Sequence, residues 1–174
     1  MKTVLRKVRR LVMFLVVLLG AAVVAFVVIG PDRLWRNFGP PDLGEVDFAT
    51  LQRRDTPNDA LACRAGVCAA RFDIESPVFA IPAAELFARV SSVLAGEPRL
   101  QEAARDPAQG TLRLIQRSRW LGFPDTINVK IVALPDGGST LLLYSRSQLG
   151  RADMGVNRAR IVRWIGLAEA EPQK

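Results

Sequence analysis

The chain has 174 residues, 49% of them apolar, so it can form one ordinary domain with a hydrophobic core plus an accessory segment. Its formal net charge is +7, but five basic residues and no acidic ones lie in the first 29 residues, and this concentration argues against a nucleic-acid partner. The chain has no histidine, which is the commonest metal ligand and proton shuttle, so we expect no metal site and no cofactor.

Residues 11–29, LVMFLVVLLGAAVVAFVVI, form an uninterrupted apolar run after a basic segment at 1–10. A bilayer core about 30 Å thick is crossed by roughly 20 helical residues, so this run predicts a transmembrane helix. The positive-inside rule then places residues 1–10 in the cytoplasm and the rest of the chain in the periplasm, beyond a bacterial inner membrane. The alternative is a cleaved signal peptide with Val23-Val24-Ala25 at the cut, although the apolar run continues past that point.

Residues 30–56 are rich in proline, glycine and aspartate, with Trp35, Phe38 and Phe48 among them. This composition predicts a linker that leads to an exported domain at 57–174. Trp35 and Phe38 are suited to a lipid interface, and packing against the domain is the alternative.

Cys63 and Cys68 are the two cysteines of the chain, and Gly66 lies between them. An exported compartment permits a disulfide. Two cysteines without histidine are too few ligands for a metal site, and redox-active cysteines are usually separated by two residues rather than four. We therefore expect a structural disulfide, with a reactive thiol pair as the alternative.

The first elements expected in the exported domain are an extended segment and a helix. The segment covers residues 72–81, where Pro77 limits it to an edge or a break. Pro82 suits the first position of the helix, and apolar residues at helical spacing continue to Leu94.

Three strands and a second helix are expected next. Alternating side chains predict strands at 111–118, 126–134 and 140–147, and the sequence PDGG at 135–138 predicts a hairpin. A last helix is expected at 153–168. This order predicts an α+β fold, an antiparallel curved sheet with two helices packed on one face, preceded by one N-terminal transmembrane helix.

The stretch YSRSQLGRADMGVNRARI, residues 144–161, concentrates polar side chains between the last strand and the last helix. Asp153 is placed to cap that helix. Asn157 falls within the apolar stripe of the helix, where a buried amide needs hydrogen-bond partners. One interpretation is a structural latch, formed by Asp125, Asp153, Asn157 and Arg160, that fixes the helix to the sheet.

The other interpretation is an anion-binding site at the same junction. Arg146 and Arg151 would converge with Arg160 near the start of the helix, beside Ser145 and Ser147. Neither serine has a histidine to activate it as a nucleophile, so the catalytic residues, if there are any, remain unknown.

Three segments of the chain resemble the bacterial domain of unknown function 1499 family. They are TPNDALAC at 56–63, RSRWLGFPDTINV at 117–129 and the stretch at 144–161. The resemblance spans roughly residues 57–167. It implies an exported or membrane-attached domain, and it supplies no catalytic residues because the family has no established activity.

Together these patterns predict a single-span inner-membrane protein of the cell envelope. Its periplasmic domain would bind an anionic or amphipathic envelope ligand, such as an anionic lipid, or an envelope protein. One alternative is a hydrolase-like enzyme acting on an envelope lipid or glycan, with Asp125, Asp153 and Glu75 as acid and base groups. The other is a purely structural envelope assembly factor.

Overall fold

The computed structural model describes residues 2–170. Met1 and residues 171–174, the outer ends of the expected N-terminal segment and exported domain, lie outside the described residues. The chain forms two compact units, one ending at Gly39 and one beginning at Pro40. The second unit thus starts well before the expected domain boundary at residue 57.

The first unit consists of helices α1 (Lys2–Ile29) and α2 (Pro31–Arg36). The helix over Val4–Ile29 is long and apolar enough to cross a membrane, and its most apolar part is not buried by any other segment of the described chain. A helix that is apolar on every face is typical of a membrane span, so α1 is compatible with a single span. Gly30 separates the two helices with a φ of 78°, and the Trp35 ring packs 6.4 Å from that of Phe26.

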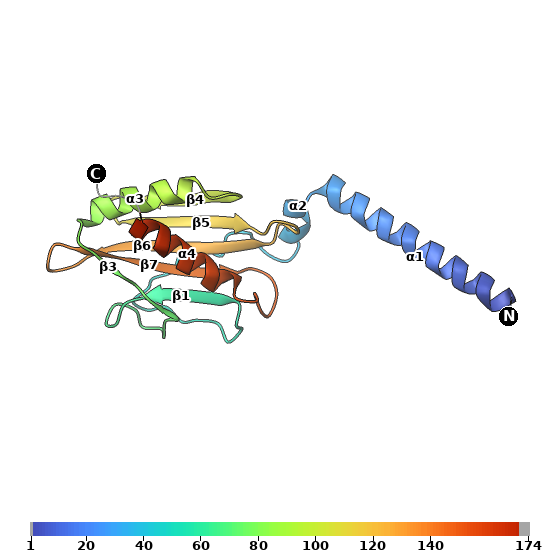
Figure 1. Cartoon of the computed structure of the whole chain (residues 1–174), viewed down its shortest axis with the longest axis horizontal. Coiled ribbons are helices and arrows are strands. Elements are labelled where there is room, and N and C mark those ends of the chain that lie inside the picture. Colours follow the sequence, from blue (N-terminus) through green and yellow to red (C-terminus); the bar gives the residue numbers. More distant parts are fainter. Residues whose placement is uncertain (1, 171–174) are drawn as a thin grey trace. The chain divides into compact units, whose positions relative to one another are not determined.

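The second unit is built on a sheet in which seven strands are described, in the order β2-β1-β7-β6-β5-β4, with β3 also paired to β7 (Figure 1). All neighbouring strands are antiparallel except β1 and β2, which are parallel. The strands are β1 (Asp59–Cys63), β2 (Ile74–Glu75), β3 (Val78–Phe79), β4 (Leu100–Asp106), β5 (Thr111–Arg117), β6 (Pro124–Ala133) and β7 (Ser139–Ser147).

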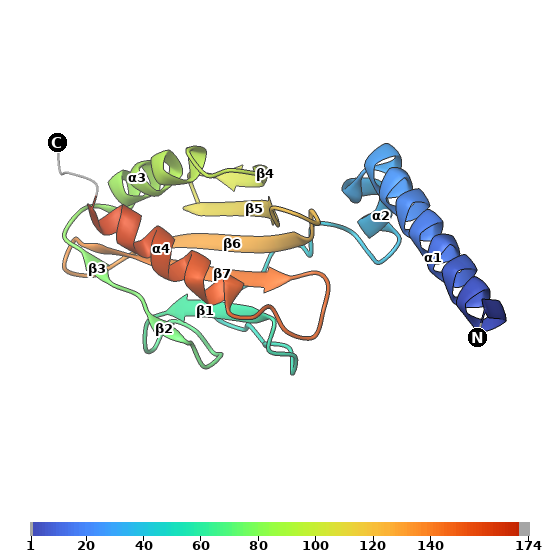
Figure 2. The same cartoon turned by 45° about the vertical axis from the view of Figure 1, so that its right-hand side comes forward.

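Helices α3 (Ala83–Ala95) and α4 (Val156–Ala170) cover one face of this sheet, which we call the helix face (Figures 1 and 2). The main hydrophobic core lies between them and the sheet, where Leu86 and Trp164 pack with Ile127 and Leu143. The expected α+β fold with an antiparallel sheet is therefore confirmed.

The opposite face of the sheet is covered by residues 40–51, which we call the strap, and we call this side the strap face. Phe48 and Leu51 of the strap are buried in a second hydrophobic cluster with Leu142 and Tyr144 of β7. Strand side chains alternate between the two faces. As a result, Leu141 and Leu143 lie on the helix face, while Leu142 and Tyr144 lie on the strap face.

Two strands were not expected from the sequence, and the last helix begins later than expected. Strand β1 is buried on both faces, so its sequence DALAC shows no alternation, and β4 is a largely exposed edge strand without an apolar pattern. Helix α4 begins at Val156 rather than at Asp153, because Met154 and Gly155 have φ values of 54° and 80°, outside the helical range.

Candidate functional site

The polar stretch between β7 and α4 forms a buried network on the helix face. Asn157 is fully buried. Its side-chain oxygen accepts hydrogen bonds from Ser145 and Arg160, both at 2.6 Å, and its side-chain nitrogen donates to Ser147 and to the backbone oxygen of Asn58, both at 3.0 Å. The amide therefore joins β7, α4 and the residue before β1.

Arg160 completes this network from the next turn of α4. Its guanidinium donates to Asp125 at 2.6 Å, to Gln116 at 2.5 Å and to Ser145 at 2.7 Å. The ion pair with Asp125 is buried, with 7% and 8% of the two side chains exposed. Because these donors and acceptors are matched within the protein, the network has little capacity left to bind an external ligand.

Asp153 holds the turn that precedes α4. Its carboxylate accepts hydrogen bonds from the backbone N–H groups of Gly155, at 2.9 Å, and Asn157, at 2.8 Å. It satisfies two of the N–H groups that the start of a helix leaves without partners. Asp125, Asp153, Asn157 and Arg160 are thus brought together around one junction.

The three arginines of the proposed anion site do not converge. Ser145 and Ser147 lie on the helix face with Arg160, whereas Arg146 lies on the strap face and donates to the backbone oxygens of Leu43, at 2.7 Å, and Gly44, at 3.0 Å. Arg151 is exposed in the loop before α4. The strand alternation that separates Arg146 from its neighbouring serines corrects this expectation.

A second polar network, not expected from the sequence, lies beside Arg146 on the strap face. The hydroxyl of Tyr144 donates to Asp59 at 2.6 Å, and Arg53 pairs with Asp59 at 2.5 Å and with Asp73 at 3.0 Å. Burial and the hydrogen bond to Asp59 raise the pKa of Tyr144. The guanidinium of Arg146 lies 5.6 Å from the centroid of the Tyr144 ring, and burial lowers its pKa. These residues are far apart in the sequence, so no local motif predicts that they form a network.

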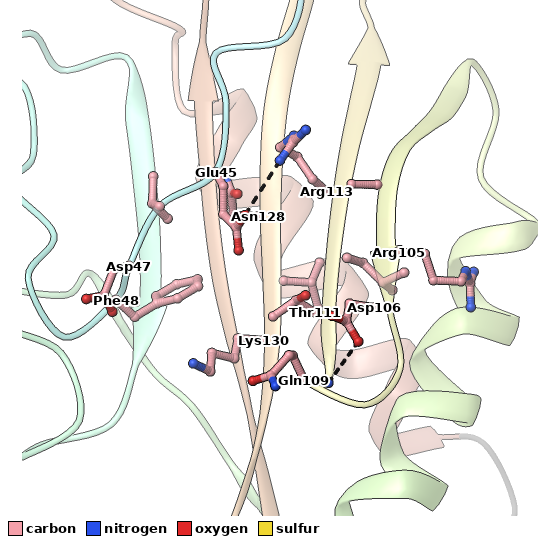
Figure 3. A pocket seen from close by; sticks show the side chains of 14 residues that line it. Glu45, Asp47, Phe48, Arg105, Asp106, Gln109, Thr111, Arg113, Asn128 and Lys130 are labelled. Carbon is pink, nitrogen blue, oxygen red and sulfur yellow. Dashed lines mark hydrogen bonds and ion pairs between the residues drawn. The ribbon is translucent and has the colours of Figure 1, made fainter.

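A groove of about 400 Å³ opens on the strap face, over β4, β5 and β6 (Figure 3). Strap residues 45–48 form one side of it, and the end of β4 with the turn into β5 forms the other. Polar side chains predominate among the residues that line it: Glu45, Asp47, Arg105, Asp106, Gln109, Thr111, Arg113, Asn128 and Lys130, with Phe48 among the apolar ones.

Several charges in this groove are already neutralised by neighbours. Arg113 pairs with Asp42 at 3.0 Å, and Asp106 accepts bonds from backbone N–H groups of the following turn. The guanidinium of Arg105 points away from the groove toward α3, where it donates to Ser91 and pairs with Glu102 at 2.7 Å (Figure 3). Within residues 2–170, no carboxylate forms an ion pair with Lys130. Lys130 is the strand partner of Thr111, so an ammonium and a hydroxyl-bearing residue adjoin at the groove.

The carboxylates considered for acid–base chemistry do not face one another across this groove. Asp125 is held by Arg160, Asp153 caps the turn before α4, and Glu75 lies on β2 beside Cys63, at the other end of β1 from the junction. In the described part of the chain, no group of three or more histidine, cysteine, aspartate or glutamate side chains could hold a metal ion.

Cys63 and Cys68 form the expected disulfide. Cys63 is the last residue of β1 and is fully buried in the strap-face cluster. The bond therefore fixes the loop after β1 to the sheet.

These features define an α+β domain with a buried polar junction, which follows in sequence a helix compatible with a single membrane span. The model of a family described as "Protein of unknown function (DUF1499)" matches residues 51–166. The chain belongs to this family, which confirms the resemblance seen in its three sequence segments. No curated protein matches the chain.

Proposed function

We propose that this chain is a single-span inner-membrane protein whose periplasmic domain binds a small ligand with an anionic group in the strap-face groove. The length and apolarity of α1 support the span, and the basic residues before it favour a cytoplasmic N-terminus. A disulfide between Cys63 and Cys68 suits an oxidising compartment.

The observation that carries the ligand proposal is the composition of the groove. Its volume of about 400 Å³ lies within the range of small-molecule sites, about 300–1,000 Å³. Lys130 supplies a cation without an ion-pair partner among the described residues, and Gln109, Thr111 and Asn128 supply hydrogen-bonding groups around it. A carboxylate or phosphate on a compact polar molecule matches this set.

The other polar residues then have structural and positioning roles. Asp125, Asp153, Asn157 and Arg160 act as the latch of α4, and Ser145 and Ser147 belong to the same hydrogen-bonded network. Arg146 is a positioning residue, because it holds the backbone of Leu43 and Gly44, and the strap continues from there into the wall of the groove. Asn128 assists by donating to the Gly44 oxygen at 3.3 Å.

The groove is tested by melting the full chain in a neutral detergent with inorganic phosphate, glycerol 3-phosphate or succinate. A ligand present at 100 times its Kd stabilises the folded state by about 2.7 kcal/mol. We expect at least one of these anions to raise the melting temperature of the wild type and of Lys7→Gln, but not that of Lys130→Gln. If no anion stabilises the wild type, or if one stabilises Lys130→Gln equally, the groove is not an anion site.

The topology is tested separately with a reporter enzyme that is active only after export. Fused to the C-terminus of the full chain, it should be active in cells. Activity of a cytoplasm-specific reporter at the same position would contradict the proposed orientation and remove the compartment argument for the disulfide.

A further inference from the structure

Two loops at one end of the sheet present large apolar side chains to solvent. Trp120 is 80% exposed and Leu121 47% in the loop between β5 and β6, and Met154 is 99% exposed in the loop before α4. Both loops lie at the same end of the sheet, because Arg117 pairs with Pro124 and Asp125 pairs with Ser147, and Figures 1 and 2 show this arrangement. We call residues 118–122 and 148–156 the loop end.

Exposed arginines accompany these apolar side chains. Arg119 places its guanidinium 5.0 Å from the ring centroid of Trp120, and Arg151 and Arg158 are exposed in and just after the second loop. The acidic residue of these loops, Asp153, is engaged in the hydrogen bonds that hold the turn before α4. The loop end is therefore both apolar and cationic.

The outward position of Met154 is fixed by the fold. Its φ of 54° lies in the left-handed region, which is uncommon for residues other than glycine. The Asp153 carboxylate holds this turn through the N–H groups on either side of Val156. The fold thus holds an apolar side chain in a fixed position that is fully exposed to solvent, and exposed apolar side chains of this kind are typical of interaction sites.

The chain also enters the second unit at this end of the sheet. Thr126, near the start of β6, accepts a hydrogen bond from the N–H of Leu43 at 2.9 Å and donates one to the oxygen of Pro41 at 3.3 Å. Only residues 30–39 separate the end of α1 from Pro40. Even a fully extended chain of this length reaches at most about 40 Å, so the tether is short enough for the loop end to reach a membrane that α1 crosses.

We propose that the loop end docks on the anionic surface of the bilayer in which α1 is anchored. Trp120, Leu121 and Met154 enter the interface between headgroups and acyl chains, where amphipathic aromatic rings are favoured. Arg119, Arg151 and Arg158 bind lipid phosphates, for which the planar guanidinium is well suited. This inference rests on the proposed span of α1, but it does not depend on the ligand of the groove.

The test measures how deeply Met154 lies in a bilayer. Met154→Cys and, as a matched control, Asp136→Cys are labelled with an environment-sensitive dye in the full chain, where both native cysteines are in the disulfide. Asp136 is exposed in the hairpin between β6 and β7, at the opposite end of the sheet. Each labelled chain is reconstituted into phosphatidylcholine vesicles, with or without phosphatidylglycerol, that contain lipids with a nitroxide quencher near the headgroup.

We expect strong quenching at position 154 in vesicles containing phosphatidylglycerol, and much weaker quenching at position 136. Each arginine should favour the docked state by about fivefold, which corresponds to about 1 kcal/mol per basic side chain near an anionic surface. Replacing Arg119, Arg151 and Arg158 by glutamine should therefore lower the quenching at 154, whereas Arg71→Gln, outside these loops, should leave it unchanged.

Two results would overturn the proposal. Equal quenching at 154 and 136 would show that the loop end does not meet lipid and would leave a protein partner as its occupant. Equal quenching with and without phosphatidylglycerol would remove the assigned role of the arginines. Resistance of the chain to carbonate extraction shows that α1 has inserted, so a failure of docking is distinguishable from a failure of the anchor.

Discussion

The two faces of the sheet use polar side chains in different ways. On the helix face, the polar residues at the β7–α4 junction bond to one another inside the core, and Asn157 and Ser145 are fully buried. On the strap face, polar residues line a groove that is open to solvent. The most conspicuous polar motif of the sequence is thus a closed structural network, while the better candidate for binding has no compact motif.

This contrast follows from what covers each face. Helix α4 packs side chains against the helix face and excludes water, so a polar group there must find protein partners. The strap covers only part of the opposite face: Phe48 and Leu51 are its buried apolar contacts, and a groove over β4, β5 and β6 stays open beside it. The groove on the strap face is therefore open to a ligand, whereas the polar junction of the helix face is not.

The largest effect is expected from breaking the buried ion pair of the helix face. Arg160→Met leaves the carboxylate of Asp125 buried without its cation, and such a change destabilises a protein by about 3–5 kcal/mol. Thermal or urea unfolding of the solubilised chain measures this loss. Arg158→Met is the matched control, because Arg158 lies two residues earlier on the same helix and is exposed; an equal loss in both variants would contradict the latch.

A smaller loss is expected from Asn157→Leu. Leucine is the better helix former, but it leaves Ser147 and the backbone oxygen of Asn58 without their donor, at a cost of about 1–3 kcal/mol. An unchanged or higher melting temperature would show that the network does not hold α4. Such a result would also contradict the difference between a closed polar network on the helix face and an open groove on the strap face.

On the strap face, Tyr144→Phe should cost less, about 1 kcal/mol. The variant loses the hydrogen bond to Asp59, but Asp59 keeps its ion pair with Arg53, so no buried charge is left alone. The measurement is the same unfolding experiment. A loss as large as that of Arg160→Met would show that the strap face is as closed as the helix face.

Much of the fold could be predicted from the sequence, because the central strands and α3 carry clear periodicity and α4 keeps Ile161, Trp164 and Ile165 on one buried face. Strands β5, β6 and β7 follow an alternation that the structure reproduces within a few residues. Strand β1 could not be predicted in this way, because both of its faces are buried. Strand β4 could not be predicted either, because it is held in the sheet by backbone pairing with β5 and has no apolar face that would mark it in the sequence.

The candidate site was predictable only in part. Asn157 could be placed on a buried helical stripe, and its partners Ser145 and Ser147 follow from the end of β7. The expected meeting of Arg146 with Arg160 overlooked that Arg146 alternates with those serines on the strand. The groove was not foreseen, because Glu45, Gln109 and Lys130 are far apart in sequence and meet through tertiary structure.

The smallest effect is expected for an ion pair at the exposed margin of the helix face. Arg163 of α4 forms two hydrogen bonds with Glu97, just after α3, and this contact is the main reason why the pKa of Glu97 lies below its ordinary value of 4.5. The Arg163 side chain is 51% exposed and that of Glu97 is 5% exposed, so solvent screens the pair from the side of the arginine. Because glutamine also keeps an oxygen that accepts hydrogen bonds, Glu97→Gln should cost only about 0.5 kcal/mol at neutral pH.

The pH dependence of this loss distinguishes the ion pair from packing. A carboxylate with a lowered folded-state pKa stabilises the protein fully above its unfolded pKa, and the stabilisation is lost as the pH falls through the folded pKa. The difference in melting temperature between wild type and Glu97→Gln should therefore be constant above about pH 6 and shrink as the pH falls below 4.5. A difference that persists once Glu97 is protonated would come from packing rather than charge. A large loss of stability in Arg160→Met, set beside this small and pH-dependent loss, would then show that the burial of an ion pair, more than the pairing itself, determines how much the pair stabilises the helix face.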